Sequence, residues 1–430
     1  MIDRGTLLMK NINILQNFKS YNYNVRQLFV VNILTQIGLG VFMVVYNFYI
    51  RELGFAETVN GKVIAMSSLA AALILIPAGV LSDKIGRRKM MIYGVVVSSL
   101  FMFLRSIFAA ESLLLISAFI GGIAMAFIQV TAIPWLAENS TKEQRVKLFS
   151  YHFAVMMGAN VIGNLLGGTM TDLFLHVGQL NEVWSIRLTL LLGSLVFALG
   201  IFPLLKTTES FKNGEPISFS LHNFKPNFPP GQLKIILIFA FASILIGFGS
   251  GLVIPYLNLY FADRFQTSNS TIGIVLSLGQ AVTAVAMIIG PAVVRKVGEM
   301  RAVVILQLLS LPFMLVTAFT QSFLLAALGF LFRQALMNAA NPIISSMMMD
   351  KVDNSLKGFA NSMNQMVFSL GWASMGPVSM TIVLIYGEYW GYSIVFSITA
   401  VLYLTSSIFF YFMFRGKSTA NSQKSLVKTS

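Results

Sequence analysis

The sequence predicts an all-α integral membrane protein in which twelve transmembrane helices form two pseudo-symmetric six-helix halves around a central cavity. Three observations lead to this fold class. First, 56% of the 430 residues are hydrophobic and only 11% are charged, whereas a soluble domain carries about 25% charged residues. Second, twelve apolar runs each reach the roughly 20 residues that a membrane helix needs. Third, the two sets of six runs repeat at a nearly constant offset. A large soluble protein is excluded.

The predicted spans follow one another with short connections, except for one longer stretch in the middle of the chain. Their ranges are 27–50, 62–82, 90–110, 113–136, 148–171, 186–205, 234–260, 271–294, 302–320, 322–347, 359–385 and 390–414. The first run lacks a small-residue cleavage site after a short apolar core, so it is interpreted as a retained span. The chain has no cysteine, which excludes disulfides and thiolate metal sites.

The net charge of +14 is explained by membrane topology. Most Lys and Arg residues lie in the N-terminal segment, in the loops after spans two, four, eight and ten, in the central loop and in the C-terminal tail. The exceptions lie in other loops or within spans: Arg51, Lys62, Arg187, Arg264, Arg105 and Arg333. This positive-inside bias predicts a multi-pass protein of the cell membrane with both termini in the cytoplasm. A nucleic-acid partner is therefore not expected.

A repeat with an offset of 212 residues divides the chain into two similar parts. The offset aligns Gly61 with Gly273, Gly86 with Gly298, Glu138 with Asp350 and Arg145 with Lys357. With one residue of slippage, Asn47 falls on Asn258 and Glu52 falls on Asp263. Two six-span halves with parallel orientation, around a site at the membrane midplane, form a transporter architecture.

The repeat and a polar central stretch rich in Pro and Asn set the predicted domain boundaries. They are a cytoplasmic N-terminal segment (1–26), an N-terminal six-helix half (27–205), a cytoplasmic linker (206–233), a C-terminal six-helix half (234–414) and a cytoplasmic tail (415–430).

The loop after the second span carries the motif GVLSDKIGRRK, from Gly79 to Lys89. It matches the pattern G-x-x-x-D-[R/K]-x-G-[R/K]-[R/K]-[R/K] at every fixed position, and in this feature the chain resembles the major facilitator superfamily. The resemblance covers nearly the whole chain and implies a bacterial twelve-helix transporter that works by alternating access. The second-half copy is degenerate, because Arg295 stands where the aspartate would be.

A second motif, GNLLGG from Gly163 to Gly168, is similar to the G-P-x-x-G-G of the drug-efflux branch of that family. Asn164 replaces the proline, so the match is partial. It favours export over import. The alternative is that these glycines only allow tight helix packing.

The charged loop is predicted to be a gating loop, which is defined by Gly79, Asp83, Gly86, Arg87, Arg88 and Glu138. We expect Gly79 to allow a close helix approach and Gly86 to form a tight turn. Asp83 is expected at the N-terminus of a helix of the other half, near Gly358, where a carboxylate is favoured. Arg87 and Arg88 are expected to reach Glu138. These contacts would form when the cytoplasmic side is closed.

Polar residues within spans are costly and usually face the bundle interior or a cavity. The candidates for substrate binding share helical faces in this way: Gln36, Asn47, Gln129, Asn160, Asn164, Asn258, Gln280, Arg333, Gln334, Asn338, Asn341, Asn361, Gln365 and Trp372. The alternative for any one amide is a structural hydrogen bond between helices, which contributes about 0.6–2 kcal/mol.

Arg333 lies near the middle of the tenth span and needs a partner. All 16 acidic residues fall in loops, tails or span ends, so we expect Arg333 to pair with backbone carbonyls, water or a bound anion. Without a buried carboxylate, neutral or anionic amphiphiles fit the cavity better than lipophilic cations. The candidates for proton coupling are Glu138, Asp350, Asp172 and His152, all at unfavourable positions.

The predicted function is secondary active transport, as proton-linked efflux of small amphiphilic compounds by a monomer in the lipid bilayer. The alternative is uptake or facilitated diffusion of a sugar or other metabolite. An enzyme is disfavoured, because the chain has no G-x-x-x-x-G-K-[S/T] phosphate loop and only three histidines. A channel is disfavoured because neither charge rings nor a selectivity filter are evident. We expect no cofactor and no metal.

Overall fold

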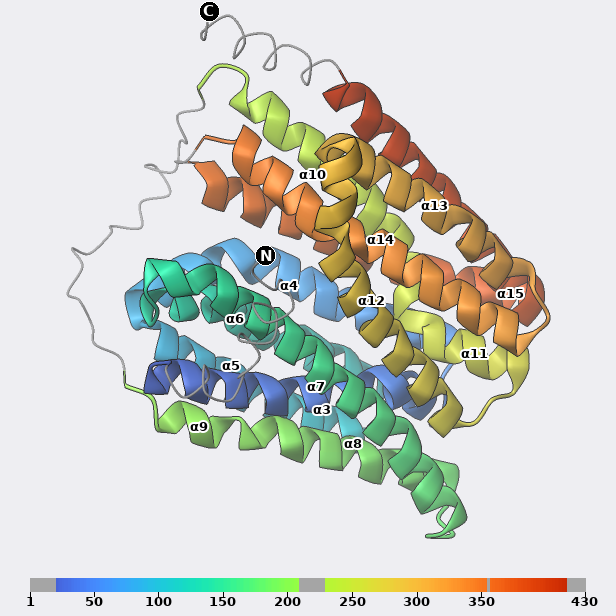
Figure 1. The fold of residues 1–430 in the computed structure, drawn as a ribbon. Helices are drawn as coiled ribbons and strands as arrows, with labels where there is room; N and C mark the ends of the chain where they lie inside the picture. Colours follow the sequence, from blue (N-terminus) through green and yellow to red (C-terminus); the bar gives the residue numbers. More distant parts are fainter. Residues whose placement is uncertain (1–20, 209–228, 354–355, 416–430) are drawn as a thin grey trace, which may run out of the picture.

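The computed structural model describes residues 21–208, 229–353 and 356–415, and these residues form helices and short connections (Figure 1). The helices are α3 (Tyr23–Glu52), α4 (Glu57–Ile85), α5 (Arg87–Ile107), α6 (Glu111–Glu138), α7 (Lys142–His176), α8 (Glu182–Leu199), α9 (Ile201–Leu205), α10 (Gln232–Val253), η2 (Ile254–Tyr256), α11 (Leu257–Phe265), α12 (Asn269–Val297), α13 (Glu299–Phe319), α14 (Phe323–Lys351) and α15 (Lys357–Phe414). Most of the predicted N-terminal segment, linker and C-terminal tail lies outside the described residues.

Within the described ranges, eleven helical segments are long and apolar enough to cross a membrane, and the last of them, Phe359–Phe414, is 56 residues long. It contains a break at Gly387, whose φ of 74° and ψ of 177° are not helical. A Cβ atom added to Gly391 would lie 2.6 Å from the Cα of Val383, so the two segments of α15 pack against each other. The positive φ at Gly387 thus separates two spans, and the twelve-helix fold class is confirmed.

Several helices extend beyond the apolar runs that predict them. The fifth span was expected over 148–171, whereas α7 runs over Lys142–His176. Local hydrogen bonds fix some of the helix starts: the side chain of Asn181 accepts a hydrogen bond of 2.9 Å from the backbone N–H of Trp184. A helix continues past its apolar stretch because its backbone hydrogen bonds do not depend on the hydropathy of the side chains.

The helices form two groups. Helices α3–α9 pack mainly on one another, and so do α10–α15; we call these the N-terminal and the C-terminal group (Figure 1). Between the groups, α4 packs along α15 and α7 packs along α12.

The two contacts between the groups are equivalent under the 212-residue offset of the repeat. A Cβ atom on Gly61 of α4 would lie 2.5 Å from the carbonyl oxygen of Gly376 in α15. A Cβ atom on Gly273 of α12 would lie 2.6 Å from the carbonyl oxygen of Asn164 in α7. Because the partner atoms are backbone atoms that cannot rotate away, both crossings need a residue without a side chain.

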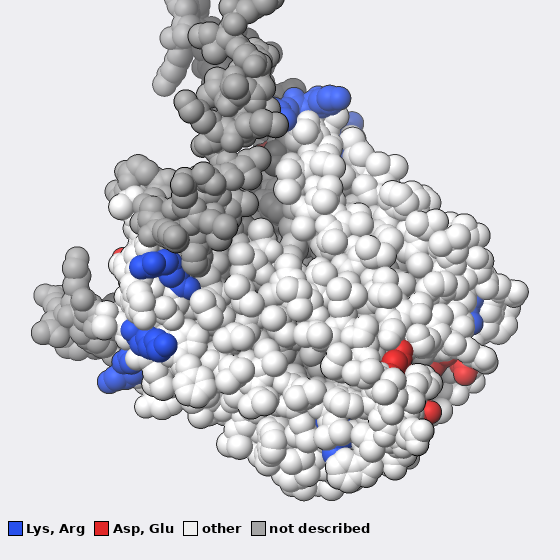
Figure 2. Space-filling model, turned by 60° about the horizontal axis from the view of Figure 1, so that its bottom comes forward, with Lys and Arg blue, Asp and Glu red and all other residues white. Residues whose placement is uncertain are grey.

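The bundle has two chemically different ends. We call the end where α3 begins, α9 ends and α10 begins the linker end, and the other the opposite end. Figure 2 shows a concentration of Lys and Arg side chains beside the grey residues, acidic side chains together with some basic ones across the molecule, and an uncharged surface between them. Many large apolar side chains of the molecule are exposed, for example Ile288, Phe412 and Val401. Such an apolar surface is favourable in contact with the hydrocarbon of a lipid bilayer and unfavourable in contact with water.

Candidate functional site

An ionic cluster joins the two helix groups at the opposite end. Arg51 at the end of α3 donates to both carboxylate oxygens of Asp263 in α11, at 2.6 and 2.9 Å. Arg51 Nε also donates to Glu57 Oε1 at 2.5 Å, and the hydroxyl of Tyr392 donates to Asp263 Oδ2 at 2.8 Å. The Asp263 side chain is only 9% exposed. Four helices therefore meet on one bidentate ion pair, a strong form of hydrogen bonding.

One helical turn deeper, two amides connect the same helices. Asn47 Nδ2 donates to Asn258 Oδ1 at 2.9 Å and to the carbonyl of Pro255 at 2.7 Å. Asn258 Nδ2 donates to the carbonyl of Val44 at 2.7 Å. Both side chains are buried. These two substrate-binding candidates are thus engaged in hydrogen bonds between the helix groups.

A third contact at this end joins α7 to α12. Asp172 accepts hydrogen bonds from Asn269 Nδ2 at 3.1 Å and from the backbone N–H of Ser270 at 2.8 Å. Nearer the middle of the bundle, Ser277 Oγ donates to the carbonyl of Val161 at 2.9 Å. Asp172 therefore holds the start of α12 against the end of α7.

Neither Arg51 nor Asp263 is among the site residues predicted from the sequence, where Asp263 aligns with Glu52. The signal that identifies them is the repeat itself, because Arg51 and Asp263 are separated by its offset of 212 residues. Equivalent positions close to a two-fold axis meet each other, so opposite charges at such positions form a pair. The same geometry brings Asn47 to Asn258.

At the linker end, the structure describes most of the gating loop. Arg87 Nε donates to Glu138 Oε1 at 2.7 Å, which is the contact expected from the sequence. Arg88 Nη2 donates to the carbonyl of Leu205 at 2.9 Å. Gly86, with φ 103°, forms the turn between α4 and α5. The Asp83 side chain lies outside the described residues.

The expectation for Gly79 was wrong. A Cβ atom at this position would meet no atom within 4 Å, so Gly79 makes no close helix approach. The close approach of α4 to the other group lies at Gly61 instead, more than four helical turns away along the helix. A glycine in a motif does not by itself reveal on which side of its helix the neighbour lies.

Arg333 belongs to α14 and is 2% exposed. Its side chain is linked to α15 and α10. Its Nη2 donates to the hydroxyl of Tyr403 at 3.2 Å, and that hydroxyl is 2.8 Å from Ser250 Oγ. The Arg333 guanidinium lies 5.8 Å from the centre of the Tyr403 ring. Arg333 forms no ion pair within the described part of the chain, and its Nε has no hydrogen-bond partner there. The observed partner is a tyrosine hydroxyl, whereas the expected partners were backbone carbonyls, water or a bound anion.

The other polar candidates of α14 form a ladder along the helix. Asn338 Nδ2 donates to the backbone carbonyl of Gln334 at 3.0 Å, and Asn341 Nδ2 donates to Asn338 Oδ1 at 3.2 Å. Gln334 is buried and its Oε1 has no hydrogen-bond partner among the described residues. The ladder leads from buried Gln334 to exposed Asn341, toward the linker end.

Three further candidates keep buried polar atoms unpaired in the described structure: Asn160 (Oδ1), Asn164 (both amide atoms) and Trp372 (Nε1). Native proteins pair nearly all such atoms, so each exception needs an explanation. The remaining candidates are half-buried (Gln36, Gln280) or exposed (Gln129, Asn361, Gln365). His152, a coupling candidate, is buried, and its Nδ1 lies 2.8 Å from Asn32 Nδ2.

No group of three or more His, Cys, Asp and Glu side chains that could hold a metal ion occurs in the described ranges.

Comparison with known proteins adds a family context. The model of the Major Facilitator Superfamily matches residues 28–373 and 239–429. Quinolone resistance protein NorA of Staphylococcus aureus is 25% identical over 248 residues, 56% of this chain and 60% of NorA. This chain therefore aligns with less than two thirds of NorA. Multidrug resistance protein 1 of Bacillus subtilis is 26% identical over 345 residues, 80% of this chain and 85% of that protein.

Solved structures show the same fold. A bacterial homolog of the human lysosomal transporter Spinster, in an inward-facing and unoccupied conformation, superposes with a TM-score of 0.74 at 15% identity, covering 91% of this chain and 96% of the other. The nucleoside transporter NupG has a TM-score of 0.73 at 15% identity, covering 92% and 100%. At these identities the likeness extends to the fold alone.

Proposed function

This chain belongs to the major facilitator superfamily and is a multi-pass secondary transporter, and we propose that it exports small amphiphilic compounds in exchange for protons by alternating access. The family comprises transporters, so the chain is not an enzyme. We further propose that it acts as a monomer, with halves of residues 27–205 and 234–414 that move against each other.

The observation that carries the alternating-access proposal is the set of contacts between the helix groups at the opposite end. Arg51 with Asp263, Asn47 with Asn258, and Asp172 with α12 hold this end together. Each contact joins one residue of the N-terminal group to one of the C-terminal group. A substrate can leave at this end only when these contacts separate, so they form a gate.

We propose that the opposite end faces the outside of the cell and that both termini are cytoplasmic. The concentration of Lys and Arg in the connections at the linker end supports this orientation. In this conformation the outward path is closed. The gating loop then lies on the cytoplasmic side, where we propose that it biases the equilibrium between the two access states. Its Arg87–Glu138 ion pair is formed while the outward path is closed.

We propose substrate contact first for the polar candidates whose side chains are not fully buried. They are exposed or half-buried in the structure: Gln36, Gln129, Gln280, Asn338, Asn341, Asn361 and Gln365. Their amides can bind hydrogen-bonding groups, while the apolar side chains between them adapt to varied shapes. Asn164, Gln334 and Arg333 are buried. Asn160 and Trp372 are half-buried, but each has a polar atom that is buried and has no hydrogen-bond partner among the described residues. We propose that these five residues contact substrate in the other access state.

The names of two relatives, quinolone resistance protein and multidrug resistance protein, suggest the compounds to test first. Quinolone antibiotics are small and amphiphilic and carry a carboxylate. Such compounds suit the proposed substrate-binding residues, most of which carry amides. Arg333, which has no ion-pair partner among the described residues, could bind their carboxylate.

The test uses inside-out membrane vesicles that contain the full chain and a fluorescent quinolone as probe. An imposed pH gradient, acidic inside, is expected to drive uptake of the probe above its equilibrium level, and collapse of the gradient should release it. Vesicles without the protein are the control. Uptake that never exceeds equilibrium would favour facilitated diffusion, and uptake of a sugar but not of a quinolone panel would favour the importer.

A further inference from the structure

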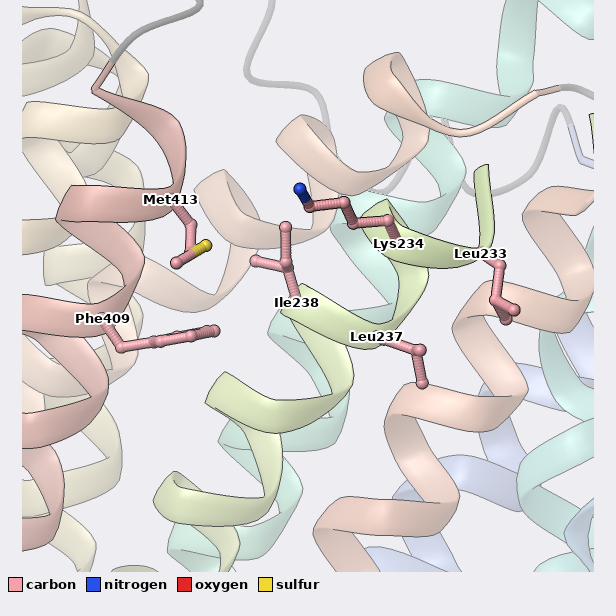
Figure 3. A pocket seen from close by; sticks show the side chains of 6 residues that line it. All are labelled: Leu233, Lys234, Leu237, Ile238, Phe409 and Met413. Atoms are coloured by element: carbon pink, nitrogen blue, oxygen red, sulfur yellow. The ribbon is translucent and has the colours of Figure 1, made fainter. Parts of the chain in front are cut away.

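A groove lies on the outer surface between the start of α10 and the end of α15 (Figure 3). Its volume is about 430 Å³, within the range of about 300–1,000 Å³ that is usual for ligand sites. The side chains that line it are Leu233, Lys234, Leu237, Ile238, Phe409 and Met413. All but one are apolar, so the groove suits a hydrocarbon chain.

The groove is located where a membrane surface would be. Leu233 lies in the first turn of α10, and Met413 lies in the last turn of α15. Both helices run from this edge into the apolar band of the bundle. Leu237, one turn deeper, is 53% exposed, and Leu233 and Met413 are 45% and 41% exposed. The apolar part of the groove therefore opens toward the acyl chains of a lipid leaflet.

Lys234 is the single charged residue of the groove. Figure 3 shows its side chain reaching across the groove, with the amino group above Ile238 and on the side of Met413. The side chain is exposed, and within the described chain it has neither an ion pair nor a hydrogen bond. An unpaired ammonium at the edge of an apolar groove attracts an anionic group.

Two more cations lie near this edge. The Lys351 ammonium lies 5.3 Å from the ring centre of Phe414, and the Arg415 guanidinium lies 5.8 Å from that of Tyr411. Both rings belong to the last turn of α15, which also supplies Met413 to the groove. The local charge is therefore complementary to an anion and not to a zwitterion with an outer cationic group.

We propose that this groove binds one anionic phospholipid, with its phosphate on Lys234 and one acyl chain along Leu237, Ile238 and Phe409. A basic residue at a membrane surface strengthens the binding of anionic lipid by about five-fold. The bound lipid holds α10 to the end of α15, which are the first and last helices of the C-terminal group. This site is separate from the proposed substrate path and does not depend on the identity of the substrate.

The test measures lipid binding to the purified full chain by native mass spectrometry, with phosphatidylglycerol and phosphatidylcholine as probes. The variants are Lys234→Gln and, as a matched control, Lys206→Gln, which removes an exposed charge at the same end. Phosphatidylglycerol is expected to bind the unaltered protein more tightly than phosphatidylcholine. Lys234→Gln should weaken that binding by about five-fold, and Lys206→Gln should leave it unchanged.

Two further measurements test the acyl chain and the phosphate of the lipid separately. Leu237→Asn is expected to weaken the binding of both lipids, because it removes apolar contact with the acyl chain. Inorganic phosphate alone should not displace the lipid. Equal losses in both lysine variants, equal binding of both lipids, displacement by phosphate, or no bound lipid at all would each overturn the proposal. Equal unfolding temperatures of the lipid-free variants exclude a folding defect as the cause.

Discussion

Arg51 and Asp263 place opposite charges at equivalent positions of the two helix groups. Arg51 satisfies its guanidinium with two carboxylates, and Asp263 receives a further hydrogen bond from Tyr392. Burying charge costs free energy unless the charges are paired and hydrogen-bonded. The removal of Arg51 therefore leaves the Asp263 carboxylate without its cation, whereas the removal of Asp263 leaves Arg51 with Glu57 as its one carboxylate partner in the cluster.

We expect strong coupling between the two residues of this pair. Arg51→Gln, Asp263→Asn and the double variant should give a coupling energy of about 0.5–3 kcal/mol in unfolding experiments. The matched control is the pair of Lys62 and Glu111, which also joins two helices, at 2.7 Å, but is 48% and 37% exposed. Its coupling should be at most about 1 kcal/mol. Equal coupling energies for both pairs would show that burial does not strengthen the Arg51–Asp263 ion pair.

Arg333 contrasts with Arg51, since its observed partner is a hydroxyl and not a carboxylate. We predict that Arg333→Lys and Arg333→Ala both lower transport, by about ten-fold for loss of a hydrogen bond to a charged group. Tyr403→Phe, which removes one oxygen atom, should have a smaller effect in the same direction.

Transport kinetics separate two possible roles of Arg333. If Arg333 contacts substrate in the other access state, its substitution should raise the KM. If Arg333 has a structural role, its substitution should lower the unfolding temperature and leave the KM unchanged. Unchanged rate and affinity in both Arg333 variants would remove the residue from the proposed transport path.

At the scale of helices, the two crossings at Gly61 and Gly273 fix how closely the groups approach. We predict that Gly61→Ala and Gly273→Ala each destabilise the protein by about 1–3 kcal/mol, because the new Cβ would overlap a backbone carbonyl. Gly158→Ala is the control, since its Cβ would meet no atom within 4 Å. In a helix that change is expected to stabilise by about 0.5–1 kcal/mol. Thermal unfolding in detergent measures all three, and similar effects at all positions would contradict the prediction.

The loop between α4 and α5 gives the second prediction at this scale. If the Arg87–Glu138 pair belongs to the proposed gating loop, Glu138→Gln should slow transport while leaving the amount of protein in the membrane unchanged. Asp83→Asn is expected to act in the same way. Initial transport rates, normalised to the amount of inserted protein, provide the measurement. Full activity in both variants would leave the loop with a role in topology alone.

At the scale of the whole molecule, transport requires the gate at the opposite end to open. The chain has no cysteine, so an introduced pair can be labelled without background. We predict that Asn47→Cys with Asn258→Cys, joined by a short bifunctional thiol reagent, abolishes transport, because the two residues are on different helix groups. A cleavable reagent should restore transport after cleavage.

The two single cysteine variants, treated with the same reagent, are the controls for this experiment. Each single variant treated with the reagent should transport as fast as the same variant without the reagent. Transport that continues in the crosslinked double variant would show that the gate does not need to open, and the alternating-access proposal would fail.

Much of the fold was readable from the sequence, since each apolar run satisfies its own backbone hydrogen bonds as a helix. The twelve spans, the asymmetric placement of Lys and Arg, and the 212-residue repeat needed no knowledge of helix packing. The ends of helices such as α7 were missed, because helices continue past the apolar runs. Of the candidate site, the sequence identified which residues are polar within spans but not which of them are paired.

The sequence by itself determined a membrane transporter fold with two related groups of helices, because hydropathy and charge act on each segment independently. Only the tertiary structure decided that Asn47 meets Asn258, that Arg51 meets Asp263 and that Arg333 donates to Tyr403. These pairs form between distant segments, so they depend on the positions and angles at which helices cross. Such crossings are set by close backbone contacts like those at Gly61 and Gly273, which no local pattern specifies.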